Sequence, residues 1–226
     1  DLVRTLCEAF GFSPVEHDKI PYGSGLINKT FLLKDRVDGN HWLLQQVNTT
    51  VFKRPELIAF NNYLAAEHLR SHHPDYLFMR GRRTAHGKDL LIHPELGTWR
   101  VFPYFANTIS YDQAPTPAHA FSAAQQFGRL TRKLDGVYVG AFQAVIPGFH
   151  DLSVRFAEFK ASIPVATEER RQRAQPVIDL ILDRAHIVDE FNRAMADPDV
   201  RTRITHNDTK LNNVLFDKDS GEAVCV

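Results

Sequence analysis

The stretch that decides the fold is polar and reads His206-Asn207-Asp208-Thr209-Lys210-Leu211-Asn212-Asn213. Short apolar runs lie before it, at 203–205, and after it, at 214–216, which predicts a loop with a strand on each side. A plain turn would also suit this composition, because aspartate caps turns and asparagine tolerates left-handed backbone. The loop is therefore the first candidate for a chemical site, with a structural turn as its alternative.

The spacing of charged and amide groups in this loop fits phosphoryl transfer. That reaction needs a carboxylate to orient and deprotonate the acceptor hydroxyl, a cation for the transferring group, and oxygen ligands for Mg²⁺. We predict Asp208 as the catalytic base, Lys210 as the cation at the γ-phosphate, and Asn213 as a metal ligand. We expect His206 to be buried and neutral, and to hold the loop through hydrogen bonds from its side chain to the backbone.

A second candidate is the turn Tyr22-Gly23-Ser24-Gly25-Leu26-Ile27-Asn28, which lies between two predicted strands. It matches neither a GxxxxGK[ST] loop nor a GxGxxG that opens a helix, so it is not a Walker A or Rossmann motif. Two glycines let the backbone approach a polyphosphate closely, and we predict that Gly23, Ser24 and Gly25 cover the phosphates of ATP. An ordinary hairpin turn is the alternative.

The chain changes character near its middle. Short apolar and β-branched runs dominate the first half, with two helical patterns, the first of which ends at Gly11. The predicted strands are 19–22, 30–33, 42–47, 89–92 and 99–105, and the predicted helices are 2–10, 55–69, 118–134, 152–163 and 168–195. This order predicts an α+β fold, with an N-terminal nucleotide-binding lobe at 1–105 and a helical lobe that carries the catalytic loop at 106–226.

The amino-acid composition limits the kinds of molecule that the protein is expected to bind. In 226 residues, 27 Lys+Arg balance 27 Asp+Glu, which leaves no basic stripe for nucleic acid and no polybasic tail for a membrane. We therefore predict a small-molecule substrate, no nucleic acid and no membrane, and no oligomeric state is indicated. Cys7 and Cys225 lack metal or redox spacing, which favours a cytoplasmic location. Because the chain opens on Asp1 and stops at Val226 inside an apolar run, we expect both ends to be trimmed.

Five longer strings carry a resemblance to a known family. The order of glycine turn, strands, helices and HNDTKLNN loop resembles the protein-kinase-like small-molecule phosphotransferases, the group of the aminoglycoside phosphotransferases and choline kinases. Within that group the chain is most similar to the N-acetylhexosamine 1-kinases, from about Tyr22 to Val226. The strings are YGSGLINKTFLL, LLQQVNTTVF, GTWRVFPYFANTISYD, IPGFHD and RITHNDTKLNNVLFD.

The resemblance implies a bilobal, protein-kinase-like fold that binds ATP and Mg²⁺ in its cleft. Its small lobe would be β-rich and its larger lobe helical and incomplete in this chain. It also implies that the acceptor is the anomeric C1 hydroxyl of an N-acetylhexosamine, and that 99–105 is a hinge that reads adenine. The cofactor-binding residues would be Gly23, Ser24, Gly25, Asn28, Gln45, Phe102 and Tyr104.

Three departures from the family pattern bear on this interpretation. Gln45 stands where kinases carry a lysine on the third strand, and Asn61 stands where the partner glutamate would lie, so a neutral Gln45–Asn61 contact would replace the ion pair. The hexosamine kinases also lack this lysine. Leu26 and Pro103 stand where those enzymes carry His and Lys. The family's main Mg²⁺ ligand, in an Ile-Asp-Leu-Asp segment, would follow Val226.

Other interpretations stay open from the sequence. His150 and Arg155 lie on a turn that enters a predicted helix, where they would contact the substrate or serve a structural role. The acceptor could be another alcohol, such as an aminoglycoside, choline or homoserine. Because the lysine and glutamate are missing, a nucleotide-binding pseudokinase that acts as a scaffold or sensor is the alternative from outside the enzymes.

Overall fold

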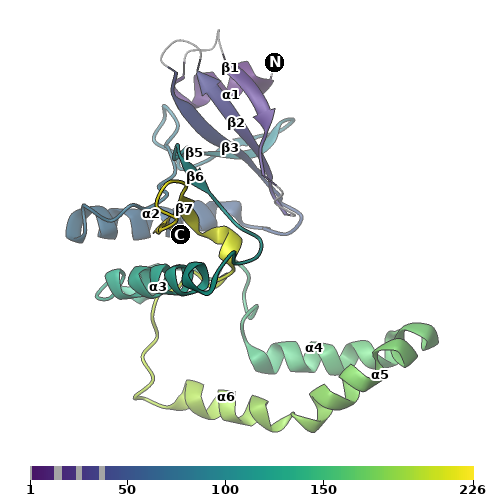
Figure 1. Ribbon diagram of the computed structural model, residues 1–226. Coiled ribbons are helices and arrows are strands. Elements are labelled where there is room, and N and C mark those ends of the chain that lie inside the picture. The colour runs from purple at the N-terminus through teal and green to yellow at the C-terminus, as the bar shows by residue number, and fades with distance from the viewer. Residues whose placement is uncertain (1, 13–16, 24–26, 36–38) are drawn as a thin grey trace. The chain divides into compact units, whose positions relative to one another are not determined.

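The main sheet has five antiparallel strands. A computed structural model describes residues 2–12, 17–23, 27–35 and 39–226, and it places the strands in the order β1-β2-β3-β5-β4 (Figure 1). All five strands expected in the first half are confirmed, with ends that differ by a few residues. They are β1 (His17–Pro21), β2 (Lys29–Asp35), β3 (His41–Val47), β4 (Leu91–His93) and β5 (Gly97–Pro103).

Side chains alternate between the two faces of a strand, so one set of apolar side chains lies on a single face of this sheet. That face packs against α1 (Leu2–Phe10). Helix α1 ends as predicted at Gly11, whose φ of 70° suits glycine, and the Phe12 amide donates back to the Cys7 carbonyl over 2.8 Å. The buried residues of this core are Leu6, Cys7, Phe10, Phe12, Leu33, Leu44, Trp99 and Val101. The opposite face carries the polar side chains of Thr30, Gln45 and Arg100 together with the buried apolar side chains of Val47 and Phe102.

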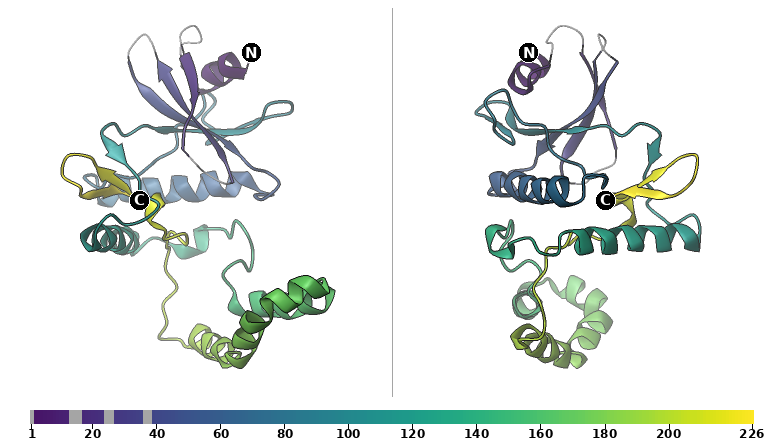
Figure 2. Two further views of the ribbon diagram at one scale, coloured as in Figure 1. Left: turned by 45° about the vertical axis from the view of Figure 1, so that its right-hand side comes forward. Right: turned by 90° about the vertical axis from the view of Figure 1, so that its left-hand side faces the viewer.

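Helices α2 (Pro55–His72) and α3 (Pro117–Lys133) lie side by side (Figure 2). Each has a proline in its first turn, where a missing amide hydrogen costs nothing, and the Thr116 side chain caps α3 by accepting from the His119 amide. A second apolar core joins them, made of Ala65, Leu69, Leu130 and Leu134.

A small sheet brings the end of the described chain onto α3. Its strands β6 (Thr108–Ile109), β7 (Leu215–Asp217) and β8 (Ala223–Cys225) are antiparallel and adjacent in that order. The side chains of Val214 and Phe216 are fully buried between this sheet and α3. This core fixes the segment that directly follows the polar loop.

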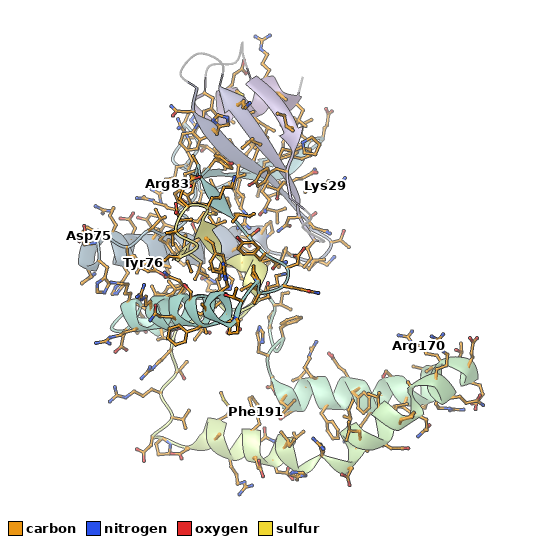
Figure 3. The ribbon with its side chains drawn as sticks, in the orientation of Figure 1. Lys29, Asp75, Tyr76, Arg83, Arg170 and Phe191 are labelled. Atoms are coloured by element: carbon orange, nitrogen blue, oxygen red, sulfur yellow. The ribbon has the colours of Figure 1, made fainter. Side chains whose placement is uncertain are left out.

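Residues 146–202 form a compact helical unit of their own, and the other unit comprises 1–145 and 203–226. The helical unit contains α4 (Leu152–Val165), α5 (Glu168–Asp183) and α6 (His186–Ala196). Asp151 and Thr167 cap α4 and α5 with their side chains. Most side chains of this unit are exposed, as Figure 3 shows for Arg170 on α5.

Two expectations about secondary structure are wrong. The helix predicted at 168–195 is two helices, because the backbone of Arg184 leaves the helical region at the end of α5 while the apolar periodicity continues across the break. Residues 203–205, which are within the described chain, form no strand, so the polar loop has a strand on its C-terminal side only. The lobe boundary between 105 and 106 stays a prediction.

In the part of the chain that the structure describes, no helix combines the length and the apolar character that crossing a membrane requires.

The core between the sheet and α1 predicts a strong effect of truncation there. Leu44 is only 1% exposed, so Leu44→Ala should lower the free energy of unfolding by about 2–5 kcal/mol through lost burial and a residual cavity. Ile92, which is 64% exposed in the same sheet, is the matched control, and Ile92→Ala should change that free energy by less than about 0.5 kcal/mol. Urea titration measures both, and equal losses would contradict this description of the core.

Candidate active site

The predicted catalytic loop brings its three functional side chains into direct contact. The Asn213 side-chain amide donates to a carboxylate oxygen of Asp208 over 2.9 Å and to the Asp208 backbone carbonyl over 2.8 Å. The Lys210 ammonium lies 3.3 Å from the same carboxylate. Because both members of this ion pair are more than half exposed, the pair is weak, and Lys210 can exchange Asp208 for another anion.

These contacts set the charge of Asp208. Desolvation of the carboxylate works against ionisation, but hydrogen bonds from Asn213 and Lys210 and the charge of Lys210 outweigh it. The pKa of Asp208 is therefore lowered from its usual 3.8. The carboxylate is ionised at neutral pH and can accept a hydrogen bond from a hydroxyl.

His206 steadies the start of the loop. Its ring contacts Phe127, with ring centroids 5.5 Å apart, and desolvation lowers its pKa although a hydrogen bond to the Asp208 backbone opposes the shift. The bond from its side chain to the backbone is thus confirmed, and the direction of the pKa shift favours the predicted neutral imidazole. The predicted burial is wrong, because the residue keeps an exposed side while packing on α3.

Residues that the spacing of the motif did not select also hold the loop. Asn207 adopts a left-handed backbone with φ of 62°, and its side-chain oxygen accepts from the Thr205 hydroxyl over 2.6 Å. The short 3₁₀ helix η2 (Leu211–Asn213) follows, and the Asn212 side chain donates to the Asp112 carboxylate over 3.0 Å. Sequence reasoning missed Asp112, because no spacing rule links it to a loop 100 positions later.

Only part of the predicted glycine turn can be placed. Ser24, Gly25 and Leu26 lie outside the described residues. Gly23 has φ of 76°, and among the described residues beyond its chain neighbours no heavy atom lies within 4 Å of the position that a Cβ would take. At the other end, Asn28 accepts from the Asn48 amide over 2.9 Å, which ties the turn to the end of β3.

Gln45 is held by a residue that sequence reasoning did not select. Its side-chain oxygen accepts from the Arg100 guanidinium, with 2.9 Å to Nε and 2.6 Å to Nη2, and its amide donates to the Thr30 hydroxyl over 3.0 Å. The expected Gln45–Asn61 contact is wrong, because Asn61 instead exchanges two hydrogen bonds with the Gln143 backbone. The available signal was a lone charge in the otherwise apolar strand Trp99-Arg100-Val101-Phe102.

The two predicted hinge residues, Phe102 and Tyr104, lie in different environments. Phe102 is buried at 8% exposure on the face of the sheet that Arg100 shares. Tyr104 follows β5, and its ring packs against those of Tyr22 and His41, with centroid distances of 5.8 and 5.7 Å. The Tyr104 amide donates to the His41 carbonyl over 3.3 Å, so this amide is already bonded within the protein.

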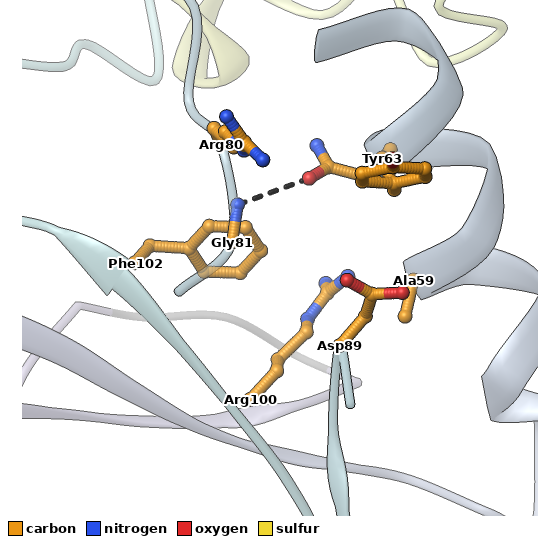
Figure 4. A pocket seen from close by; sticks show the side chains of 8 residues that line it. Ala59, Tyr63, Arg80, Gly81, Asp89, Arg100 and Phe102 are labelled. Carbon is orange, nitrogen blue, oxygen red and sulfur yellow. Dashed lines mark hydrogen bonds between the residues drawn. The ribbon is translucent and has the colours of Figure 1, made fainter. Parts of the chain in front are cut away.

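A cavity between α2 and the sheet lies beside Arg100 (Figure 4). Its volume of about 10 Å³ is at the lower limit for one water molecule, so it is no site for a sugar or a nucleotide. The Gly81 amide donates to Asn62 across it over 3.1 Å. Its lining residues are Ala59, Asn62, Tyr63, Arg80, Gly81, Asp89, Arg100 and Phe102.

His150 and Arg155, the predicted substrate residues, belong to the helical unit. The Arg155 guanidinium pairs with Glu158 over 3.0 Å and lies 5.8 Å from the Phe149 ring centre, and its Nε is buried without an acceptor among the described residues. His150 is exposed and packs edge-on against Phe149. Their role toward a substrate stays a prediction.

The main sheet, α2 and the loop around Asp208 are the parts of a protein-kinase-like fold. The chain belongs to the phosphotransferase enzyme family, whose model matches residues 19–226. The predicted α+β, protein-kinase-like fold is confirmed by two similar solved structures.

The first solved structure is an amicoumacin kinase in complex with AMP-PNP, Ca²⁺ and Ami, with a TM-score of 0.58, 13% identity, and coverage of 98% of this chain and 61% of that one. The second is a spectinomycin phosphotransferase in complex with ADP and its antibiotic, with a TM-score of 0.60, 12% identity, and coverage of 99% and 66%. The chain thus spans less than two thirds of the length of either.

Removing the Asn213 amide should raise the pKa of Asp208, because that amide donates a hydrogen bond to the ionised carboxylate. We expect Asn213→Ala to move the NMR titration of the Asp208 carboxyl carbon to higher pH. Asn212→Ala is the matched control, since the Asn212 amide bonds Asp112 and not Asp208. An unchanged titration in Asn213→Ala, or an equal shift in the control, would contradict this origin of the shift.

Proposed function

We propose that the protein is a kinase that transfers the γ-phosphoryl group of ATP to the hydroxyl of a sugar. The observation that carries this proposal is the direct contact of Asp208 with Asn213 and Lys210 in one loop. A carboxylate, a cation and an amide oxygen are the groups that phosphoryl transfer asks of a protein. The family to which the chain belongs and the nucleotides bound in both similar structures agree with it.

The donor set fits a divalent metal bound to a nucleotide. Because the Asn213 nitrogen donates to Asp208, its side-chain oxygen is left for a hard cation such as Mg²⁺. No described residue beyond its chain neighbours occupies the place where a side chain at Gly23 would begin, which would suit close approach to a polyphosphate. When bound, Mg²⁺-ATP would supply the phosphoryl group, held by Asn213 and by the turn at 23–25, Asn28, Gln45 and the hinge residues Phe102 and Tyr104.

Each residue of the loop then has a definite task. The ionised Asp208 accepts a hydrogen bond from the acceptor hydroxyl, orients its oxygen and takes its proton as the new bond forms. Lys210 leaves its weak pair with Asp208 and balances the charge of the transferred group. Asn213 keeps the carboxylate in one orientation through its two hydrogen bonds. Val214, fully buried, anchors the end of the loop.

Loss of the carboxylate should stop turnover without stopping nucleotide binding. We expect Asp208→Asn to lower kcat by at least ~100-fold, the low end for removal of a general base, while the Kd for ATP changes little. The control is Asp219→Asn, because Asp219 bonds Asn107 in the β7–β8 turn. A coupled assay for ADP release measures turnover. An unchanged kcat in Asp208→Asn would contradict the assignment of Asp208 as the catalytic base.

The acceptor that we propose is the anomeric C1 hydroxyl of an N-acetylhexosamine. Its support is the likeness of the GTWRVF and HNDTKLNN strings to the hexosamine 1-kinases. His150 and Arg155 are the substrate contacts included in this proposal. The similar structures, a kinase of amicoumacin and a phosphotransferase of spectinomycin, keep another alcohol as the second candidate. A pseudokinase is disfavoured, because the contacts of Asp208, Lys210 and Asn213 are all present.

A screen of acceptors separates these candidates. We expect N-acetylglucosamine or N-acetylgalactosamine to give the highest rate of ADP release, and ³¹P NMR of the product to show an anomeric phosphate. Hexoses, amino alcohols, spectinomycin and kanamycin form the comparison set. Faster turnover of an antibiotic would replace the sugar, and ADP binding without turnover of any acceptor would favour the pseudokinase.

A further inference from the structure

Three polar side chains cross the main sheet in a single row on the face opposite α1. Thr30, Gln45 and Arg100 are cross-strand neighbours in β2, β3 and β5. Hydrogen bonds link them in sequence, from the Arg100 guanidinium to Gln45 and from Gln45 to Thr30. The row thus places a cation beside the position of β3 where protein kinases carry their phosphate-binding lysine.

The charge of Arg100 has no carboxylate partner among the described side chains. Asp89 lines the same small cavity (Figure 4), and its carboxylate pairs with Arg83 over 2.8 Å. The guanidinium donates hydrogen bonds to Gln45 and lies 4.9 Å from the centre of the Phe102 ring. Both of these side chains are uncharged. These contacts occupy only Nε and one Nη2 hydrogen of its five donors, so most of its capacity to bind an anion is available.

The cation is also close to the end of the glycine turn. The Asn28 side-chain nitrogen lies 3.5 Å from the Gln45 oxygen that Arg100 binds. Gln45 therefore connects the last residue of that turn with the guanidinium. Desolvation lowers the pKa of Arg100 to about 10, which still leaves it protonated at neutral pH, and the residue is only partly buried.

We propose that Arg100 binds the polyphosphate of the nucleotide and supplies, from β5, the positive charge that other kinases supply from a lysine on β3. Gln45 positions the guanidinium and adds no charge of its own. The fork of an arginine suits two phosphate oxygens at once. This inference rests on the proposed function, because it assumes that the protein binds a nucleotide.

The competing explanation is structural, because Arg100 could simply join the sheet to α2. Nucleotides that differ only in their phosphates separate the two. In the intact protein, Arg100→Met should weaken ADP binding by about tenfold or more, while adenosine binding changes less than about twofold. Arg100→Lys, which keeps the charge but not the fork, should lie between Arg100→Met and the wild type.

Arg82→Met is the matched control. Arg82 donates to the carbonyls of Phe10 and Gly11 and stacks on Phe12 and Trp42, so it is a structural arginine next to α1. This variant should lower the melting temperature and leave the ratio of ADP to adenosine affinity unchanged. Isothermal titration calorimetry gives the affinities. An unchanged ratio in Arg100→Met overturns the inference.

A measurement on the wild type covers the case in which Arg100→Met fails to fold. Phenylglyoxal modifies accessible arginines, and mass spectrometry locates the modified residue. We expect ADP to protect Arg100 and adenosine not to protect it. Equal modification with both, or no modification in the free protein, overturns the inference. If the wild type binds ADP no better than adenosine, or binds neither, the proposed function itself fails.

Discussion

The hydrogen bonds from the Asn213 amide to Asp208 are the interaction on which the candidate site depends. They orient a carboxylate that is otherwise exposed, and with Lys210 they lower its pKa. The loop can hold this geometry because the next residues, Val214 and Phe216, are fully buried on α3. An apolar anchor directly after a polar turn thus converts a flexible sequence into a fixed arrangement of reactive groups.

The proposed nucleotide site also depends on a positive charge on the main sheet. A kinase that lacks lysine on β3 would offer little attraction to a polyphosphate, and Gln45 alone adds none. The structure instead places the Arg100 guanidinium on Gln45, in the next strand. Because cross-strand neighbours share one face of a sheet, a charge can move from one strand to another and stay at the same place in space. Under our proposal, Arg100 supplies from β5 the positive charge that a lysine on β3 supplies in other kinases.

Much of the fold could be predicted from the sequence because its signals are local. Short apolar and β-branched runs indicated the strands of the main sheet, and Gly11 and Pro55 marked helix ends through their own backbone chemistry. The break at Arg184 could not be predicted, because no proline or glycine marks it and the apolar period continues. Residues 203–205 look like a strand, but a strand also needs a partner, which periodicity does not reveal.

The residues of the candidate site also divide into those that local sequence spacing predicts and those that it does not. The contact of Asp208, Lys210 and Asn213 followed from their spacing within one loop. The roles of Arg100, Asn61 and Asp112 did not, because each depends on residues that only the tertiary fold brings near. Asn61 in particular was assigned to Gln45 by analogy with an ion pair, whereas the fold gives it the backbone of Gln143.

The proposed mechanism requires Asp208 to face the acceptor hydroxyl and Asn213 to face the metal. A crystal structure of the intact protein with AMP-PNP, Mg²⁺ and its best acceptor would test both positions. We expect a carboxylate oxygen of Asp208 at a hydrogen-bond distance of about 2.6–3.2 Å from the acceptor hydroxyl, and the Asn213 side-chain oxygen on the metal. An acceptor hydroxyl that faces another residue, with Asp208 still bound to Lys210, would contradict this mechanism.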